Sequence, residues 1–186
     1  FQFESAGMRN VITQLGPESI EDLIAVISLY RPGPMESIPR YIRNRHNPQL
    51  VTYKTPELRP ILDVTYGCIV YQEQVMQICR RLAGYSYGRA DLVRRAMAKK
   101  KHDVMEKERE SFLDGAEQNG IDRKIANEIS DEMSSFASYA FNKSHAAAYA
   151  VLAYRTAYLK CHYPREYMAA LLTSVLDNTS KLTEYI

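Results

Sequence analysis

The sequence predicts an all-α fold, a multi-helix domain with few or no short strands, and three observations carry this prediction. Apolar residues recur at helical spacing through most of the chain. Capping residues precede these segments, and glycine or proline ends them. The one stretch that favours extended backbone, GCIVY at 67–71, is brief. With 186 residues, 46% of them hydrophobic, the chain can bury the core of one domain.

Capping residues and helix breakers divide the first quarter of the chain. Ser5 is placed to cap a short helix that stops at Gly16. A second helix follows in 17–30, and RPGP at 31–34 ends it because neither proline can continue a helix. The apolar residues that share one face of this second helix are Ile20, Leu23, Ile24 and Ile27. A broken, basic amphipathic segment follows at 35–46.

In the middle of the chain, capping residues and a glycine again mark where helices begin and end. Thr55 and Pro56 form a cap and first-turn pair. The segment QEQVMQICRRLA at 72–83 is a helix that ends at Gly84, a residue suited to the left-handed position after a helix. Ser86 is placed to cap the helix that follows.

The last part of the chain is also helical. A helix at about 103–118 stops at the Asn-Gly pair 119–120, and Asp122 caps the next one. The loop SYAFNKSH at 138–145 leads into a long alanine-rich helix that Pro164 ends. Pro164 then serves as the first-turn proline of a final helix.

Composition narrows the class of protein. The net charge of +2 means that any nucleic-acid signal must come from local clusters of basic residues. Cys68, Cys79 and Cys161 form no C-x-x-C pair, which favours reduced thiols in a cytoplasmic protein. The longest apolar-rich run, AAAYAVLAY at 146–154, is far too short to span a membrane, and no signal peptide is visible.

Motifs of several enzyme classes are missing from the sequence. There is no Asp-x-Asp pair for two-metal phosphoryl transfer, no zinc-protease helix, no P-loop and no nucleophile elbow. We therefore expect no catalytic residue and no metal ligand in this chain, although parts that could bind phosphate are present.

The first such part is ADLVRRAMAKKK at 90–101, which holds five cations and one acid. On a helix, the residues that form the apolar face are Leu92, Val93, Ala96 and Met97. Arg94 and Arg95 flank Ala98 on the opposite face, and Lys99, Lys100 and Lys101 lie at or beyond the helix end. Lysines at a helix C-terminus are also favoured by the macrodipole, so a solvated helix end is one interpretation. Two arginines that can bind phosphate in a bidentate manner favour the other interpretation, a phosphate-binding cluster.

Two further motifs carry candidate ligands. FNKSH at 141–145 joins an amide, an ammonium, a hydroxyl and an imidazole at the start of a helix, where free N–H groups favour anions. Its members are Asn142, Lys143, Ser144 and His145. Spacing alone also allows Ser144 to be only the N-cap of that helix. Arg31 lies in the third motif, YRPGPM, where a plain helix stop with an exposed arginine is the alternative.

Taken together, FQFES, LYRPGPM, YGCIVYQEQVMQI, ADLVRRAMAKKK, FNKSHAAAYAVLAYRTAYLK and HYPREYMAALLTSVLDN resemble, in this order, the bacterial DNA polymerase III α-subunits, which are C-family replicative polymerases. The resemblance runs nearly from end to end and is closer to the DnaE type than to the longer PolC type, because YQEQVM and RRAM-x-KKK are intact. One departure is Ala98, where the family often has glycine; alanine is still small.

The resemblance implies that residues 1–186 are a fingers-domain fragment of a DNA-directed DNA polymerase. Residues 1–30 would then be the entry next to the palm, and 86–163 would hold the basic helices that face nucleotide and DNA. The palm, the exonuclease-like domain and the C-terminal domains would lie outside the chain. Since the chain starts at Phe1 without an initiator Met, an internal fragment is what we expect.

The same resemblance assigns roles to the candidate residues. Arg94, Arg95, Arg31, Asn142, Lys143, Ser144 and His145 would bind the incoming deoxynucleoside triphosphate. Lys99, Lys100 and Lys101 would bind the backbone of primer-template DNA. Mg²⁺ would be held by palm aspartates outside the chain, so the fragment alone is expected to be inactive. The full-length protein would also bind the sliding clamp and other replisome subunits, in the cytoplasm and without a membrane.

Two alternatives from other classes remain open on the residues alone. One is a non-catalytic helical module that binds nucleic acid. The other is a structural interaction domain in which the basic cluster is merely solvated.

Overall fold

The computed structural model describes residues 1–98, 102–137 and 141–186. Within these ranges the regular structure is entirely helical, which confirms the predicted all-α class. The only β-type pairing in the same ranges is one isolated parallel bridge between Tyr71 and Phe141. The stretch expected to be extended, 67–71, therefore contributes one residue to a bridge and no strand.

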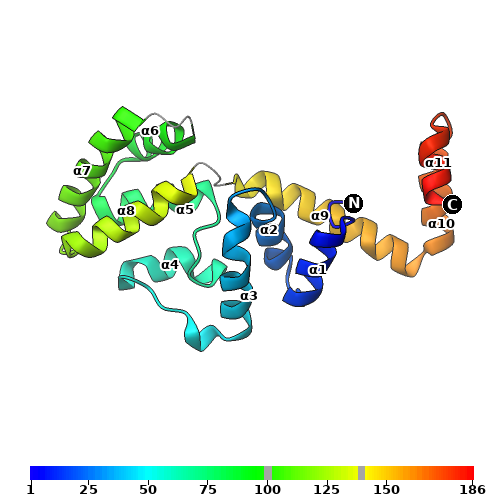
Figure 1. Cartoon of the computed structure of the whole chain (residues 1–186), viewed down its shortest axis with the longest axis horizontal. Coiled ribbons are helices and arrows are strands. Elements are labelled where there is room, and N and C mark those ends of the chain that lie inside the picture. Colours follow the sequence, from blue (N-terminus) through cyan, green and yellow to red (C-terminus); the bar gives the residue numbers. More distant parts are fainter. Residues whose placement is uncertain (99–101, 138–140) are drawn as a thin grey trace.

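The helices form two groups and an arm, which Figure 1 shows along its horizontal axis. The central group consists of α1 (Ala6–Leu15), α2 (Ile20–Leu29), α3 (Ile38–His46) and α9 (Lys143–His162). The outer group consists of α5 (Gln72–Ala83), α6 (Tyr87–Ala98), α7 (His102–Gln118) and α8 (Arg123–Ala137). The short helix α4 (Arg59–Leu62) lies beside α5, and the C-terminal arm continues from α9 into α10 (Pro164–Ser174) and α11 (Thr179–Tyr185).

Short-range hydrogen bonds explain why most helices begin where the sequence predicts. The Ser5 hydroxyl accepts a hydrogen bond from the Met8 amide at 3.2 Å, and Asp122 accepts from the amides of Lys124 and Ile125. Helix α5 ends at Gly84, whose φ of 69° lies in the left-handed region that glycine adopts without strain. Capping of this kind is set by a few neighbouring residues, so the sequence predicts it well.

Helix α2 is buried more completely than its amphipathic pattern predicts. Ile24 and Ile27 are buried as expected, but Ile20 is 40% exposed. Residues on the supposed polar side are buried as well, and they include Ala25, Val26, Ser28 and Leu29. The reason is that α2 packs along α9 while α1 and the segment after Gly33 cover its other sides.

A single hydrophobic core runs through both groups of helices. An ion pair also joins the two groups, because Arg40 of α3 lies 3.0 Å from Glu132 of α8. A second pair, Lys54 with Glu128 at 2.9 Å, joins the connection after α3 to α8. Cys68 and Cys79 are free thiols within this core, and burial raises the pKa of Cys79 to about 12.

The C-terminal arm is much less buried. None of the residues of α10 or α11 is buried. Large apolar side chains are exposed from the third turn of α9 onward, among them Val151, Leu152, Tyr154, Tyr158, Leu159, Tyr163 and Leu176. The described helices include none with the length and apolar character needed to cross a membrane.

Candidate nucleotide and nucleic-acid interface

The first turn of α5 is the fixed point of the candidate site. Gln74 is 4% exposed, and its carbonyl oxygen accepts hydrogen bonds from the amides of Val70 and Tyr71 at 2.8 and 3.0 Å. Its amide nitrogen donates to the Ile61 carbonyl and to the Thr65 hydroxyl. A buried polar side chain with its hydrogen bonds satisfied in this way fixes the chain around it. The segment 61–71 and the start of α5 are therefore held as one unit.

The two residues before Gln74 each hold one of the predicted phosphate-binding motifs. The side-chain oxygen of Gln72 accepts a hydrogen bond from Nη1 of Arg94 on α6 at 3.1 Å. The carboxylate of Glu73 accepts from the backbone amide of Lys143 at 3.2 Å and from the side chain of Asn142 at 3.0 Å. Adjacent residues of α5 thus bring together motifs that lie about 50 residues apart in the chain.

Asp91 binds both arginines of α6. Its carboxylate lies 2.7 Å from Nη2 of Arg94 and 2.7 Å from Nε of Arg95. The hydrogen bond from Arg94, with both positive charges nearby, lowers the pKa of Asp91, so the carboxylate is ionised at neutral pH. Arg94 is 27% exposed and Arg95 is 63% exposed, so Arg95 is the more accessible to a ligand.

The face of α6 differs from the predicted one at Leu92, which is 65% exposed. Ala90, with 0% exposure, and Val93 and Ala96 form the buried face instead. The small Ala90 side chain lets α6 pack closely on the rest of the outer group, so the side of the helix that carries Ala90 is buried and Leu92 is left exposed. Arg94 consequently lies over the start of α5 rather than pointing straight outward.

Helix α9 begins within the FNKSH motif. Asn142, and not Ser144, is its N-cap, since the Asn142 side chain accepts a hydrogen bond from the His145 amide at 2.9 Å. Ser144 is an exposed residue of the first turn. The ammonium of Lys143 lies 3.0 Å from a carboxylate oxygen of Glu21 on α2, and 5.3 Å from the centre of the buried Tyr71 ring.

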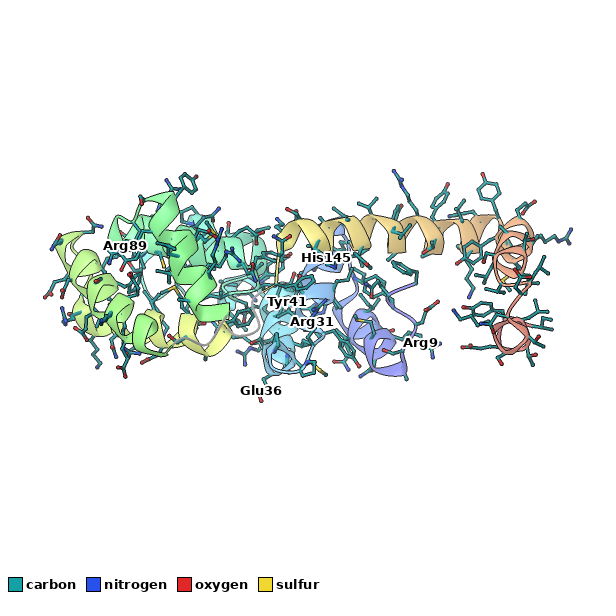
Figure 2. All side chains as sticks on the ribbon, turned by 90° about the horizontal axis from the view of Figure 1, so that it is seen from above. Arg9, Arg31, Glu36, Tyr41, Arg89 and His145 are labelled. Atoms are coloured by element: carbon teal, nitrogen blue, oxygen red, sulfur yellow. The ribbon has the colours of Figure 1, made fainter. Side chains whose placement is uncertain are left out.

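A chain of ring contacts connects Arg31 with the same helix. The Arg31 guanidinium lies over the Phe141 ring, the Phe141 and His145 rings meet edge to face with centroids 5.3 Å apart, and His145 lies 4.6 Å from Tyr149. Figure 2 shows Arg31 and His145 in the middle of the molecule, beside the start of α9. The RPGP motif and the FNKSH motif are therefore parts of one site.

Arg94, Asn142 and Lys143 thus lie around the starts of α5 and α9, since each contacts Gln72 or Glu73. Arg31 and His145 are joined to the same place through Phe141. Arg95 is held beside Arg94 by Asp91, and Ser144 lies in the first turn of α9. Lys99, Lys100 and Lys101 lie outside the described residues. For the part of the chain with known positions, there is no group of three His, Cys, Asp or Glu side chains that could hold a metal ion. The nearby acids Glu21, Glu73 and Asp91 are each bound to a cation or an amide instead.

Sequence reasoning assigned no role to five residues of this site. They are Glu21, Gln72, Glu73, Asp91 and Phe141. For Asp91 a signal was present, because acids three and four residues before an arginine on a helix pair with it. For Glu21 and Glu73 no local signal exists, because their partners lie 122 and 70 residues away in the sequence.

Comparison with known proteins gives a consistent result. The family model described as "Bacterial DNA polymerase III alpha subunit finger domain" matches residues 1–120. The DNA polymerase III subunit alpha of Thermus aquaticus is 54% identical over the whole of this chain, and that of Pasteurella multocida is 52% identical over 98% of it. The Staphylococcus epidermidis protein of the same name is 50% identical over the whole chain. The chain spans only 16% to 18% of the length of these relatives.

Proposed function

The chain belongs to the bacterial DNA polymerase III alpha-subunit family, within which it matches the finger domain, and from this premise we propose that it binds the incoming deoxynucleoside triphosphate and the primer-template during DNA synthesis. One observation carries the proposal. Arg94 of α6 and the first turn of α9 converge on the first turn of α5, where Gln72 holds Arg94 and Glu73 holds the turn of α9. Asp91 holds Arg95 beside Arg94.

The proposed role follows from the chemistry of nucleotidyl transfer. A primer 3′ hydroxyl displaces pyrophosphate from the triphosphate, and negative charge grows on the leaving phosphates. Guanidinium and ammonium groups placed near those phosphates stabilise this charge, and planar guanidinium groups can bind two phosphate oxygens at once. We assign this role first to Arg95 and Arg94. The other residues that we propose to bind the nucleotide lie beside them, and they are Arg31, Asn142, Lys143, Ser144 and His145.

Mg²⁺ would be bound by other parts of the full-length polymerase. The described acids next to the arginines are engaged with cations and amides, so they offer no free carboxylate pair at this place. When bound, the metal would neutralise phosphate charge and activate the hydroxyl. The residues of this chain position the triphosphate, and the fragment by itself is expected not to extend a primer. The sliding clamp and other replisome subunits are partners of the whole protein in the same proposal.

Single-nucleotide incorporation by the full-length polymerase tests this function. Arg95→Ala is expected to lower kcat/KM for the nucleotide, with a loss of about 2–4 kcal/mol in transition-state stabilisation. Arg94→Ala is expected to lower it as well. Arg165→Ala is the matched control, because Arg165 is an exposed arginine of α10 in the C-terminal arm. If the Arg94 and Arg95 variants change only DNA affinity, the cluster binds the DNA backbone and not the triphosphate.

A further inference from the structure

The arginines Arg94 and Arg95 on α6 and the lysine Lys143 at the start of α9 are already bound to carboxylates of the same chain. Asp91 binds Arg94 and Arg95 at 2.7 Å each. Glu21 binds the Lys143 ammonium at 3.0 Å. Glu73 accepts from the Lys143 amide with both of its oxygens, at 3.2 Å each, in the position that an anion takes at a helix N-terminus.

The balance of charge at each motif follows from these contacts. At the start of α9 the two carboxylates of Glu21 and Glu73 face one ammonium, which leaves a formal charge of −1 on these three groups. On α6 the two arginines face one carboxylate, which leaves +1. With the Arg31 guanidinium over Phe141 counted as well, the start of α9 has no net positive charge for a phosphate, although it has the donors that would bind one.

We propose that Glu73 and Asp91 are internal counter-ions that occupy the phosphate positions of the site and give up their partners when the triphosphate binds. The inference rests on the proposed function, since it concerns the regulation of the same site. A carboxylate offers two oxygens and one charge, whereas a terminal phosphate offers three oxygens and up to two charges. The triphosphate therefore outcompetes the two acids, while a weakly charged anion does not.

The internal counter-ions also keep the site in order before a ligand binds. Arg94 and Arg95 are neighbours in sequence, and without Asp91 their like charges would push the two guanidinium groups apart. Asp91 holds both at fixed positions, so a ligand replaces one anion with another instead of gathering two mobile side chains. The same reasoning applies to Glu73, which holds the first turn of α9 next to the first turn of α5.

Neutral substitutions test the proposal in the full-length polymerase. Glu73→Gln and Asp91→Asn keep one of the two acceptor oxygens of each side chain and remove the competing charge. Each is expected to lower the KM for the nucleotide by about two- to fivefold, the range that one charge at a helix N-terminus gives, with a smaller change in kcat. Inhibition by inorganic pyrophosphate should become stronger by a similar factor, because it binds the same positions.

Three controls separate the charge from other effects. Glu73→Asp and Asp91→Glu keep the charge and should not lower the KM. Glu184→Gln removes one acid from the exposed arm and should leave the KM unchanged. Thermal unfolding of each variant checks that the protein is folded.

The outcomes are distinguishable from failure of the proposed function. If Arg95→Ala leaves the nucleotide parameters intact, the proposed function itself fails. If Arg95→Ala raises the KM while Glu73→Gln and Asp91→Asn leave it unchanged or raise it, only the counter-ion proposal is overturned. Loss of the unfolding transition in both neutral variants overturns it too, because the two acids would then be structural.

Discussion

The guanidinium carbon of Arg31 lies over the ring of Phe141, 3.7 Å from the ring centre. This contact joins two motifs that are 110 residues apart in the sequence, and it places Arg31 next to the helix that begins with Lys143. Because Arg31 is exposed on its other side, its positive charge remains available to a ligand.

We expect Arg31→Ala and Phe141→Leu to differ in size of effect. Removing the ring abolishes the cation–π interaction, which is worth about 0.5–1 kcal/mol at an exposed site, so kcat/KM for the nucleotide should fall by about two- to fivefold. Removing the guanidinium also removes a group that donates hydrogen bonds to phosphate, so transition-state stabilisation should decrease by about 2–4 kcal/mol. Single-nucleotide incorporation measures both. Equal effects of the two substitutions would show that Arg31 only supports the structure.

Lys99, Lys100 and Lys101 are predicted to bind the DNA backbone. Replacing the three together with alanine should weaken primer-template binding and reduce the slope of log affinity against log salt by about 0.9 for each phosphate that the variant no longer binds. Titrations of labelled primer-template at several salt concentrations give the slope. The triple variant Lys160→Ala, Arg165→Ala and Lys181→Ala removes the same charge from the exposed arm. Equal decreases in affinity for the two triple variants would contradict specific binding of the backbone.

The buried pair of Asp22 and Arg45 should make stability depend on acid pH. Asp22 is 1% exposed, and Arg45 binds it at 3.3 Å. Burial raises the pKa of Asp22, but hydrogen bonds from the Glu18 amide and from Arg45 outweigh burial, so the pKa lies below its ordinary value. A lowered pKa gives stability that is complete above the unfolded value of about 3.9 and is lost as the pH falls through the folded value.

The substitution Asp22→Asn is therefore expected to destabilise the protein by about 3–5 kcal/mol at neutral pH, because it leaves Arg45 without its buried partner. The difference in unfolding free energy from the unsubstituted protein should shrink as the pH is lowered below about 4. Urea denaturation at a series of pH values measures it. Asp177→Asn, at an exposed acid of the C-terminal arm, should show no such difference at any pH. A constant difference for Asp22→Asn would contradict the role of its charge.

Close packing of α7 on the end of α5 makes Gly115 sensitive to substitution. A Cβ atom at Gly115 would lie 2.6 Å from the carbonyl oxygen of Ala83, which is a backbone atom and cannot rotate away. Gly115→Ala should therefore destabilise the protein by about 1–3 kcal/mol. At Gly88 on α6 no atom lies within 4 Å of such a Cβ, so Gly88→Ala should be neutral or stabilising by up to about 1 kcal/mol. Denaturation midpoints compare the two, and a stable Gly115→Ala variant would show that the helices can separate.

The fold class and most helix ends could be predicted from the sequence because they depend on neighbouring residues. Ser5, Gly84 and Asp122 act on backbone groups within a few positions, and the structure confirms all three. Ser144, which the sequence allowed as the N-cap of α9, is not the cap, and the sequence could not decide because Asn and Ser are equally good caps by type. The choice between them depends on Glu73, which binds Asn142 from another helix.

The candidate site shows the same division. The basic residues could be selected as candidate phosphate ligands from their types. The acids that bind them could not be predicted, because the contacts of Glu21 and Glu73 form only when α2, α5 and α9 meet. Leu92 was misplaced for a related reason. The helical period predicts a face, whereas the neighbour on which α6 packs decides which way that face turns.

Helix α9 connects the site with the arm as a rigid rod. Its 20 residues span about 30 Å, with the candidate phosphate-binding turn at one end and α10 attached at the other. The buried residues of α9 are Ala146, Ala150 and Ala153. Their small side chains let α2 pack against this part of the helix and support it there. A tilt of about 5° around this support would move the far end by about 1–2 Å. Helix α9 is thus a lever, through which a movement of its first turn on Glu73 becomes a displacement of the C-terminal arm.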